Sequence, residues 1–286
     1  MSSAAVTHSG GQFPARRALA VLPARISSTR LPQKMLLEAA GVPLVVRSAQ
    51  NVIASKLFAR VVVAADDDKI LSVCRKHAIE AVATRADHPS GSDRVNECVS
   101  ALVAAGAQAD VVVNVQGDEP ELAHADFAAL LAAFDDARVE MATLSLPLVD
   151  RAQFENPNVV KVVCDARGNA LYFSRAPIPS RAHPTADSAI AARRHLGVYA
   201  FTPQALARFC ALPRGALEKT ESLEQLRWLE HGFDLRVVAA VRGTTSIDTA
   251  ADWAEYKARV EAPTRVDDGG TNRALGTATR TGSKAG

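Results

Sequence analysis

Several features that would place this chain in a common class are missing from its sequence. Only four of its 286 residues are cysteine, and no two of them form a C-x-x-C pair. This spacing excludes a cysteine-based zinc site and indicates reduced thiols in a cytoplasmic protein. The apolar runs are far shorter than the roughly 20 residues that cross a bilayer, and no apolar core follows the N-terminus as it does in a secretory signal. We therefore expect a soluble cytoplasmic protein with no membrane partner.

The sequence also lacks the common nucleotide-binding fingerprints. It contains neither the G-x-x-x-x-G-K-[ST] loop of P-loop enzymes nor a G-x-G-x-x-G turn after a strand. Both a P-loop NTPase and a typical dinucleotide enzyme are therefore disfavoured. Any phosphate group that this chain binds must be held by cationic side chains rather than by a glycine-rich loop.

A strong charge of one sign is absent as well. The net charge is only +2, and residues 1–17 and 263–286 each contribute +2, which leaves −2 for residues 18–262. A slightly acidic body argues against a nucleic-acid partner, which needs a broad basic surface. The two ends also lack a hydrophobic period, so we predict disordered tails at 1–17 and 263–286 around one large domain at 18–262.

The first half of this body alternates between buried strands and amphipathic helices. Such a β-α-β-α-β pattern predicts an α/β fold with a parallel sheet and helices on both faces. The clearest strand is Asp110–Gln116, a run of valines. The other expected strands are Ala18–Pro23, Arg60–Ala65 and Ala81–Thr84, and the expected helices are Pro43–Ser55, a helix starting at Asp66–Lys69, Ser92–Ala105 with Ser92 as its cap, and Ala123–Phe134.

The second half of the chain departs from this pattern. Strand-like segments at Val159–Asp165 and Leu171–Ser174 flank a turn, which predicts an antiparallel hairpin inserted in the fold at about residues 141–231. The remaining expected elements are strands at Met141–Leu148, His195–Phe201 and Leu235–Val241, a loop at 180–192, one amphipathic helix at Leu217–His231 and a closing helix at Ala250–Glu261.

Three cations follow the first predicted strand within ten residues. Arg25, Arg30 and Lys34 lie among small hydroxyl residues in a segment bracketed by prolines. Ligands of open α/β sheets bind at the carboxyl ends of the strands, and arginine and lysine side chains suit phosphate oxygens. A polyphosphate is therefore the natural ligand, although the composition alone fits a solvated surface loop equally well.

Two aspartates follow strands at what should be the same edge of the sheet. Asp118 comes after Asp110–Gln116 through a tight exit at Gly117, and Asp248 precedes the last helix. A carboxylate beside phosphates is a typical anchor for Mg²⁺, which takes one or two carboxylates with phosphate oxygens and waters. The alternatives are a turn or capping residue at position 118 and an N-cap at position 248, the commoner role for a lone aspartate before a helix.

A third candidate segment leads from a short strand into a helix. Ser90 and Gly91 precede the expected helix start, and Arg94 follows it. The free N–H groups of a helix start can hold an oxyanion or a base edge. An ordinary capped turn explains the same residues equally well.

The second half contributes a fourth set of polar residues. His195 and Tyr199 alternate along a strand, so their side chains point to the same side. Glu218, Glu221 and Gln225 share one face of the predicted helix. Carboxylates and amides on one face suit the hydroxyls of a sugar, but such a face is more often solvated.

These motifs occur together in a recognisable order. LPARISSTRLPQK, TRADHPSGSDR, NVQGDEP, RHLGVYAF, LEKTESLEQLRWLEHG and SIDT span about residues 19–261. In this combination the chain resembles the 3-deoxy-manno-octulosonate (Kdo) cytidylyltransferase family. The resemblance implies a Rossmann-like nucleotidyltransferase fold of the GT-A-like kind, with a mixed sheet, usually in a homodimer that uses Mg²⁺. It also implies the reaction CTP + Kdo → CMP-Kdo + pyrophosphate, which activates Kdo for the lipid A inner core of lipopolysaccharide.

The resemblance further implies roles for single residues. It assigns the triphosphate to Arg25, Arg30 and Lys34, the Mg²⁺ to Asp118 and Asp248, and the cytidine to Ser90, Gly91 and Arg94. It places Gln116, Arg175, His195, Tyr199, Glu221 and Gln225 near the sugar acid. Ser92 departs from the threonine that is usual in the family but keeps its hydroxyl.

The implied chemistry needs little covalent work from the protein. The anomeric hydroxyl of the sugar acid attacks the α-phosphorus in line and pyrophosphate leaves, with no covalent enzyme intermediate. Because both substrates are anions, positioning and charge neutralisation supply most of the rate. Two alternatives remain: a sibling enzyme that activates another sugar acid, and an inactive sugar-nucleotide binding protein. The second predicts the loss of a metal-binding aspartate or a loop cation, and none is lost here.

Overall fold

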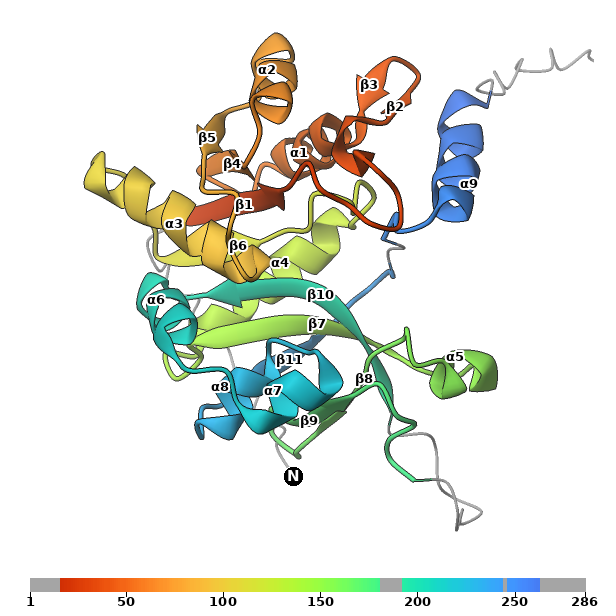
Figure 1. The fold of residues 1–286 in the computed structure, drawn as a ribbon. Helices are drawn as coiled ribbons and strands as arrows, with labels where there is room; N and C mark the ends of the chain where they lie inside the picture. The colour runs from red at the N-terminus through yellow and green to blue at the C-terminus, as the bar shows by residue number, and fades with distance from the viewer. Residues whose placement is uncertain (1–15, 181–191, 244–245, 263–286) are drawn as a thin grey trace, which may run out of the picture.

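A nine-stranded mixed sheet forms the centre of the molecule (Figure 1). The computed structural model describes residues 16–180, 192–243 and 246–262, so the predicted tails and most of the predicted loop at 180–192 lie outside the described residues. The strands follow the order β11-β7-β10-β6-β1-β4-β5, while β8 pairs with β10 and with β9. This arrangement confirms the predicted α/β fold with a mixed sheet.

The parallel half of the sheet is built from the first strands of the chain. They are β1 (Ala18–Ala24), β4 (Arg60–Ala65), β5 (Ala81–Ala83) and β6 (Val111–Asn114). In the register of β1, Val21 lies opposite Val62 on one side and Asn114 on the other. Valine and alanine runs suit these strands because helices cover both faces, so neither face meets water.

The helices of this half pack on the two faces of the sheet. They are α1 (Leu44–Ala54), α2 (Asp68–Lys76), α3 (Gly91–Ala104) and α4 (His124–Ala132). The predicted cap of α3 was wrong. Ser90 is the N-cap and accepts the N–H of Asp93, whereas Ser92 is buried and donates to Glu224. Capping needs a side chain outside the first turn, and Ser92 is already inside it.

Antiparallel strands extend the sheet in the second half of the chain. β10 (Arg193–Phe201) runs antiparallel to both β6 and β7 (Met141–Pro147), and β11 (Arg236–Ala239) runs parallel to β7. The predicted hairpin is present as β8 (Lys161–Cys164) and β9 (Ala170–Ser174). Figure 1 shows β10 and β7 crossing the middle of the molecule, between the parallel strands and β9.

The single helix predicted at 217–231 is wrong. Two short helices, α7 (Ala216–Glu221) and α8 (Leu226–Glu230), replace it, and Ser222 between them is left-handed with φ 54°. Glu218 and Arg227 form a buried pair across the break, with both guanidinium bonds at 2.8 Å. This pair folds α8 back against α7, which one straight helix does not permit.

The remaining elements complete the frame of the site. Sequence analysis missed α6 (Pro203–Ala211), although its cap Thr202 and the proline in its first turn are a known signature. The other elements are η1 (Lys34–Leu36), β2 (Glu38–Ala39), β3 (Val42–Pro43), η2 (Ala133–Asp135), α5 (Arg151–Glu155) and α9 (Ala250–Glu261). Within the described residues, no helix has the length and apolar character needed to cross a bilayer.

Candidate active site

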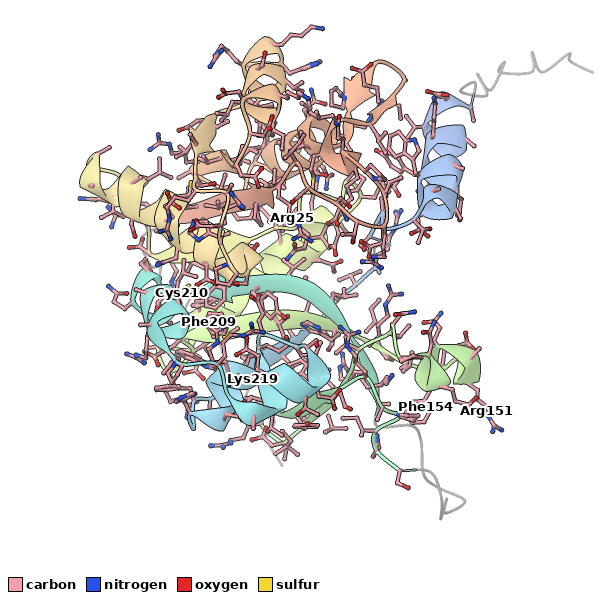
Figure 2. All side chains as sticks on the ribbon, in the orientation of Figure 1. Arg25, Arg151, Phe154, Phe209, Cys210 and Lys219 are labelled. Atoms are coloured by element: carbon pink, nitrogen blue, oxygen red, sulfur yellow. The ribbon has the colours of Figure 1, made fainter. Side chains whose placement is uncertain are left out.

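A pocket of about 340 Å³ opens at the carboxyl ends of β1 and β6. Figure 2 labels Arg25 at the end of β1, between the parallel half of the sheet and β10. The predicted phosphate, cytidine and metal residues all line this pocket: Arg25, Arg30, Lys34, Ser90, Gly91, Arg94, Asp118 and Asp248. The juxtaposition follows from the topology, because parallel neighbouring strands end at one edge of the sheet.

Lys34 lies between the two aspartates. Its Nζ donates to a carboxylate oxygen of Asp118, to Asp248 Oδ1 at 3.0 Å and to the carbonyl of Ile247 at 3.2 Å. Arg30 reaches the same oxygen of Asp248 at 3.0 Å. Burial alone lowers the pKa of Lys34 and raises that of Asp248, but their pairing outweighs it, so the Lys34 pKa is raised and the Asp248 pKa is lowered. Both groups are therefore charged at neutral pH.

Asp248 does not cap the last helix. Thr249 is the N-cap of α9, and it forms a capping box with Asp252. The N–H of Ile247 donates to the carbonyl of Asp118 at 3.1 Å, which fixes the segment before the helix against the exit of β6. This backbone bond brings the two carboxylates to the same cation.

The pair Asp118 and Asp248 fits a Mg²⁺ ion bound together with a nucleotide. The two carboxylates already converge on one positive group, the Lys34 ammonium. Among the described residues, no cluster of three or more His, Cys, Asp or Glu suits a metal ion by itself. Mg²⁺ does not need such a cluster, because one or two carboxylates suffice when phosphate oxygens and waters complete its shell.

Arg94 holds the first turn of α3 against the ends of β4 and β5. Its buried guanidinium pairs with Asp66 at 3.2 Å and donates to the carbonyl of Arg85 at 2.9 Å and to the hydroxyl of Thr84 at 2.7 Å. Burial lowers the pKa of Arg94, and the Asp66 charge opposes that shift. The bonds connect the end of β5 and the segment after it to the end of β4.

A second pocket, of about 520 Å³, adjoins the first. The two share Gln116, Asp118 and Asp248, so a ligand in one pocket can contact a ligand in the other. Of the residues predicted near a sugar acid, Gln116, Arg175, His195, Tyr199 and Gln225 line this second pocket. Gln116 donates its amide to the carbonyl of Gly197 at 2.9 Å, which connects the exit of β6 to β10.

His195 is neutral in this pocket. Burial lowers its pKa to about 3. Its Nε2 lies 3.0 Å from the hydroxyl of Thr143, and that hydroxyl donates its own proton to the carbonyl of Val198 at 2.8 Å. The ring also contacts Tyr199, at a centroid distance of 5.4 Å.

Glu221 lies behind the second pocket rather than in its lining. Its carboxylate accepts the Ser174 hydroxyl at 2.5 Å and the N–H of Arg175 at 2.9 Å. Burial raises the pKa of Glu221, but these hydrogen bonds outweigh it, so the pKa is lowered overall. Gln225, in contrast, faces the pocket, and its buried Nε2 has no hydrogen-bond partner among the described residues.

Two glutamates in the second pocket were given no role from the sequence. Glu119 is buried beside Asp118, and burial together with that neighbouring charge raises its pKa to about 8. Glu224 accepts the Ser92 hydroxyl at 2.8 Å, and its other oxygen has no partner among the described residues. Glu119 stood in the NVQGDEP motif and could have been singled out, whereas only the break at Ser222 turns Glu224 inward.

Comparisons with known proteins agree with this geometry. A family model described as cytidylyltransferase matches residues 19–237. The 3-deoxy-manno-octulosonate cytidylyltransferase of Leptothrix cholodnii is 46% identical over 248 residues, which cover 84% of this chain and 90% of the relative. The protein of the same name from Acidobacterium capsulatum is 45% identical over 234 residues, covering 82% and 92%.

A solved structure leads to the same family. The CMP:2-keto-3-deoxy-manno-octonic acid synthetase complexed with CTP superposes with a TM-score of 0.77 at 36% identity, covering 85% of this chain and 98% of that one. A cytidylyltransferase of Leptospira borgpetersenii, with a TM-score of 0.56 and 16% identity, shares the fold alone. The chain therefore belongs to the 3-deoxy-manno-octulosonate cytidylyltransferases, within the wider cytidylyltransferase family.

Proposed function

We propose that this chain transfers CMP from CTP to the anomeric hydroxyl of Kdo, giving CMP-Kdo and pyrophosphate. The observation that carries the proposal is the pair of adjoining pockets that share Asp118 and Gln116. Loop cations line the first pocket, and Arg175, His195, Glu224 and Gln225 are among the side chains that line the second. A nucleotide in the first and a sugar acid in the second meet at Asp118.

The loop cations counter the repulsion between two anionic substrates. Arg25 and Arg30 are exposed at the pocket, and we assign their guanidinium groups to the triphosphate. Lys34 donates to two carboxylates and the Ile247 carbonyl in this structure, so its ammonium contributes positive charge to the pocket and bonds a phosphate oxygen by exchanging one of these acceptors. These charges stabilise the negative charge that moves onto pyrophosphate as the bond to the α-phosphorus breaks.

Asp118 and Asp248 are the residues that we assign to Mg²⁺. When bound there with the nucleotide, the ion supplies charge neutralisation at the phosphates and a lowered pKa for the attacking hydroxyl. The exit of β6 and the backbone bond from Ile247 to Asp118 hold both carboxylates in place before any ligand arrives.

Arg175 is suited to the carboxylate of the sugar acid. Its guanidinium donates to the carbonyls of Glu221 at 2.8 Å, Pro157 at 3.2 Å and Ser222 at 3.5 Å. An arginine has more N–H donors than these three bonds use, so donors remain for a ligand. The neutral His195 and the unpartnered oxygen of Glu224 then accept sugar hydroxyls.

Buried polar atoms without partners make the second pocket selective. A sugar acid that lacks the matching hydroxyls leaves Glu224 Oε2 and Gln225 Nε2 unsatisfied, which costs about 1–3 kcal/mol for each group. A polyhydroxylated acid such as Kdo supplies the partners that these atoms need. Close analogues carry similar hydroxyls, so the assay compares sugar acids directly.

The proposal includes three expectations about context. We place the reaction in the cytoplasm, the product in lipopolysaccharide synthesis, and the enzyme in a homodimer. The family resemblance supports all three. Light scattering on the purified protein tests the dimer, and CMP-Kdo formed in a cytoplasmic fraction but not in a membrane fraction tests the location.

The direct test is product formation from CTP, Mg²⁺ and a panel of sugar acids. We expect CMP-Kdo and pyrophosphate, with Kdo as the best acceptor, and a chelator should abolish turnover. Failure to form any CMP-sugar contradicts the transferase, and a better rate with another sugar acid supports the sibling enzyme instead.

Arg30→Ala should lower turnover on the order of 10²-fold, because a charge that stabilises the phosphates is lost. The matched control is Arg151→Ala on α5, whose side chain is 83% exposed and points away from the site (Figure 2). Equal turnover in the two variants contradicts the assignment of Arg30 to the triphosphate.

Asp118→Asn should lower activity and raise the Mg²⁺ concentration needed for half-maximal rate. One of the two carboxylates that we assign to the ion becomes an uncharged amide, which is a weaker ligand. Asp135→Asn, in η2, is the control. Full activity of the Asp118 variant at unchanged Mg²⁺ removes that residue from the metal site.

A further inference from the structure

Lys161 is a lysine with no exposed surface. Its relative exposure is 0%, and its Nζ donates to the carbonyls of Asn156 at 3.0 Å, Val159 at 2.7 Å and Arg175 at 2.5 Å. No ion pair of the described residues includes it. Lysine is rarely buried completely without a carboxylate, because the ammonium loses its hydration. Here three backbone oxygens replace the water.

Two of the three carbonyls belong to residues that line the second pocket, Val159 and Arg175. Asn158, Val159 and Val160 line that pocket from one side, and Arg175 lines it from the end of β9. Lys161 therefore connects the loop before β8 to the residue after β9. All three ammonium protons are used in these bonds, so Lys161 itself has no donor for a ligand.

Glu221 holds the same residue from the opposite side. Its carboxylate accepts the backbone N–H of Arg175 at 2.9 Å, while its own carbonyl accepts Arg175 Nε at 2.8 Å. Lys161 binds the Arg175 carbonyl. The backbone carbonyl of Arg175 thus accepts from the Lys161 ammonium, and its backbone N–H donates to the Glu221 carboxylate. We call this arrangement the Lys161–Glu221 clamp.

We propose that Lys161 and Glu221 are positioning residues that fix Arg175 for the carboxylate of the sugar acid. The inference rests on the proposed function, and it gives Glu221 an indirect role in place of the direct sugar contact that the sequence implies. A guanidinium recognises a carboxylate through paired, directional bonds. Misplacement by about 1 Å can cost on the order of 10²-fold in rate, so a charged clamp on the backbone of this arginine has a catalytic consequence.

The test compares Michaelis constants for the two substrates. Lys161→Met and Glu221→Gln should each raise the KM for Kdo at least about tenfold and leave the KM for CTP within about twofold of wild type. Ser174→Ala should raise the KM for Kdo by about threefold, since it removes one bond to Glu221 from a buried side chain that no sugar can reach. Wild-type CMP-Kdo synthesis, measured first in the same assay, tests the proposed function separately.

Glu230→Gln is the matched control. Glu230 lies on α8 and also accepts backbone N–H groups, from Leu217 at 2.9 Å and Glu218 at 3.2 Å, but it lies outside both pockets. We expect a loss of thermal stability with an unchanged KM for Kdo. If Lys161→Met does not fold, the Glu221 and Ser174 variants still decide the question.

Three results overturn the clamp. The first is an unchanged KM for Kdo in folded Lys161→Met and Glu221→Gln. The second is an equal rise in Glu230→Gln, which makes the effect a general loosening of the fold. The third is a rise in Glu221→Gln with none in Ser174→Ala or Lys161→Met, which indicates direct contact between Glu221 and the sugar.

Discussion

The neutral His195 ring makes the stability of this protein depend on pH in a defined window. Its pKa falls from 6.5 to about 3 because the folded protein withholds water from the ring. The folded-state pKa is lower than the unfolded one, so lowering the pH favours the unfolded chain. The stabilising contribution of the neutral ring is complete above about pH 6.5 and is lost progressively as the pH falls toward 3.

The size of this effect follows from the two pKa values. Near pH 5 an unfolded histidine is almost fully protonated, while the folded His195 remains neutral. The free energy of unfolding should then be about 2 kcal/mol lower than near pH 7 from this residue alone.

His195→Gln tests this reasoning. Glutamine keeps an amide donor for the Thr143 hydroxyl, which His195 contacts at 3.0 Å, but it does not titrate. In urea unfolding followed by circular dichroism, wild type should lose about 2 kcal/mol more than the variant between pH 7 and pH 5. His124→Gln, at the exposed start of α4, should retain the wild-type slope. Equal pH dependence in wild type and His195→Gln refutes a neutral, buried imidazole.

Further predictions concern packing around the site. Arg227→Met should lower the free energy of unfolding by about 3–5 kcal/mol, because it leaves the Glu218 carboxylate buried without its main partner. Arg214 is the outer partner of Glu218, and its side chain is 54% exposed. Arg214→Met should therefore lower the free energy of unfolding by less than about 1 kcal/mol, with both variants measured by urea titration. Gly117→Ala should lower turnover while changing the free energy of unfolding little. Its Cβ would lie 3.1 Å from the carbonyl of Pro23, so the exit of β6 that presents Asp118 must shift; turnover equal to wild type contradicts this.

Local signals in the sequence were enough to place much of the fold. The strand at Arg60–Ala65 and the helix at Ala250–Glu261 were predicted to the residue. In the first case a valine run between charged residues defines both ends, and in the second Thr249 and Asp252 form a capping box. The failure at 217–231 has a tertiary cause. Nothing local shows that Glu218 and Arg227 pair across a break at Ser222.

The same distinction applies to the candidate site. Arg25 and Asp118 follow predicted strands within two residues, so sheet topology brings them to one edge, whereas Lys34 reaches the same pocket from η1, at the end of the loop after β1. Glu224 reaches the pocket only because the chain breaks between α7 and α8. On the single helix predicted from the sequence, Glu218, Glu221 and Gln225 share one face and Glu224 lies off it. For Asp248, the sequence allowed two roles, the N-cap of the last helix and a metal ligand. The choice depends on which residue caps that helix, and in the structure it is Thr249.

The Lys34 contacts also bear on how the protein is made. Lys34 and Asp248 are 214 positions apart in the chain, and Lys34 and Asp118 are 84 apart. A nascent chain can pair β1, β4 and β6 long before residue 248 has left the ribosome, but its site is still missing one carboxylate. Closing so long a loop is slow compared with forming local helices. The return of activity during refolding therefore measures when Asp248 reaches Lys34, not when the core forms.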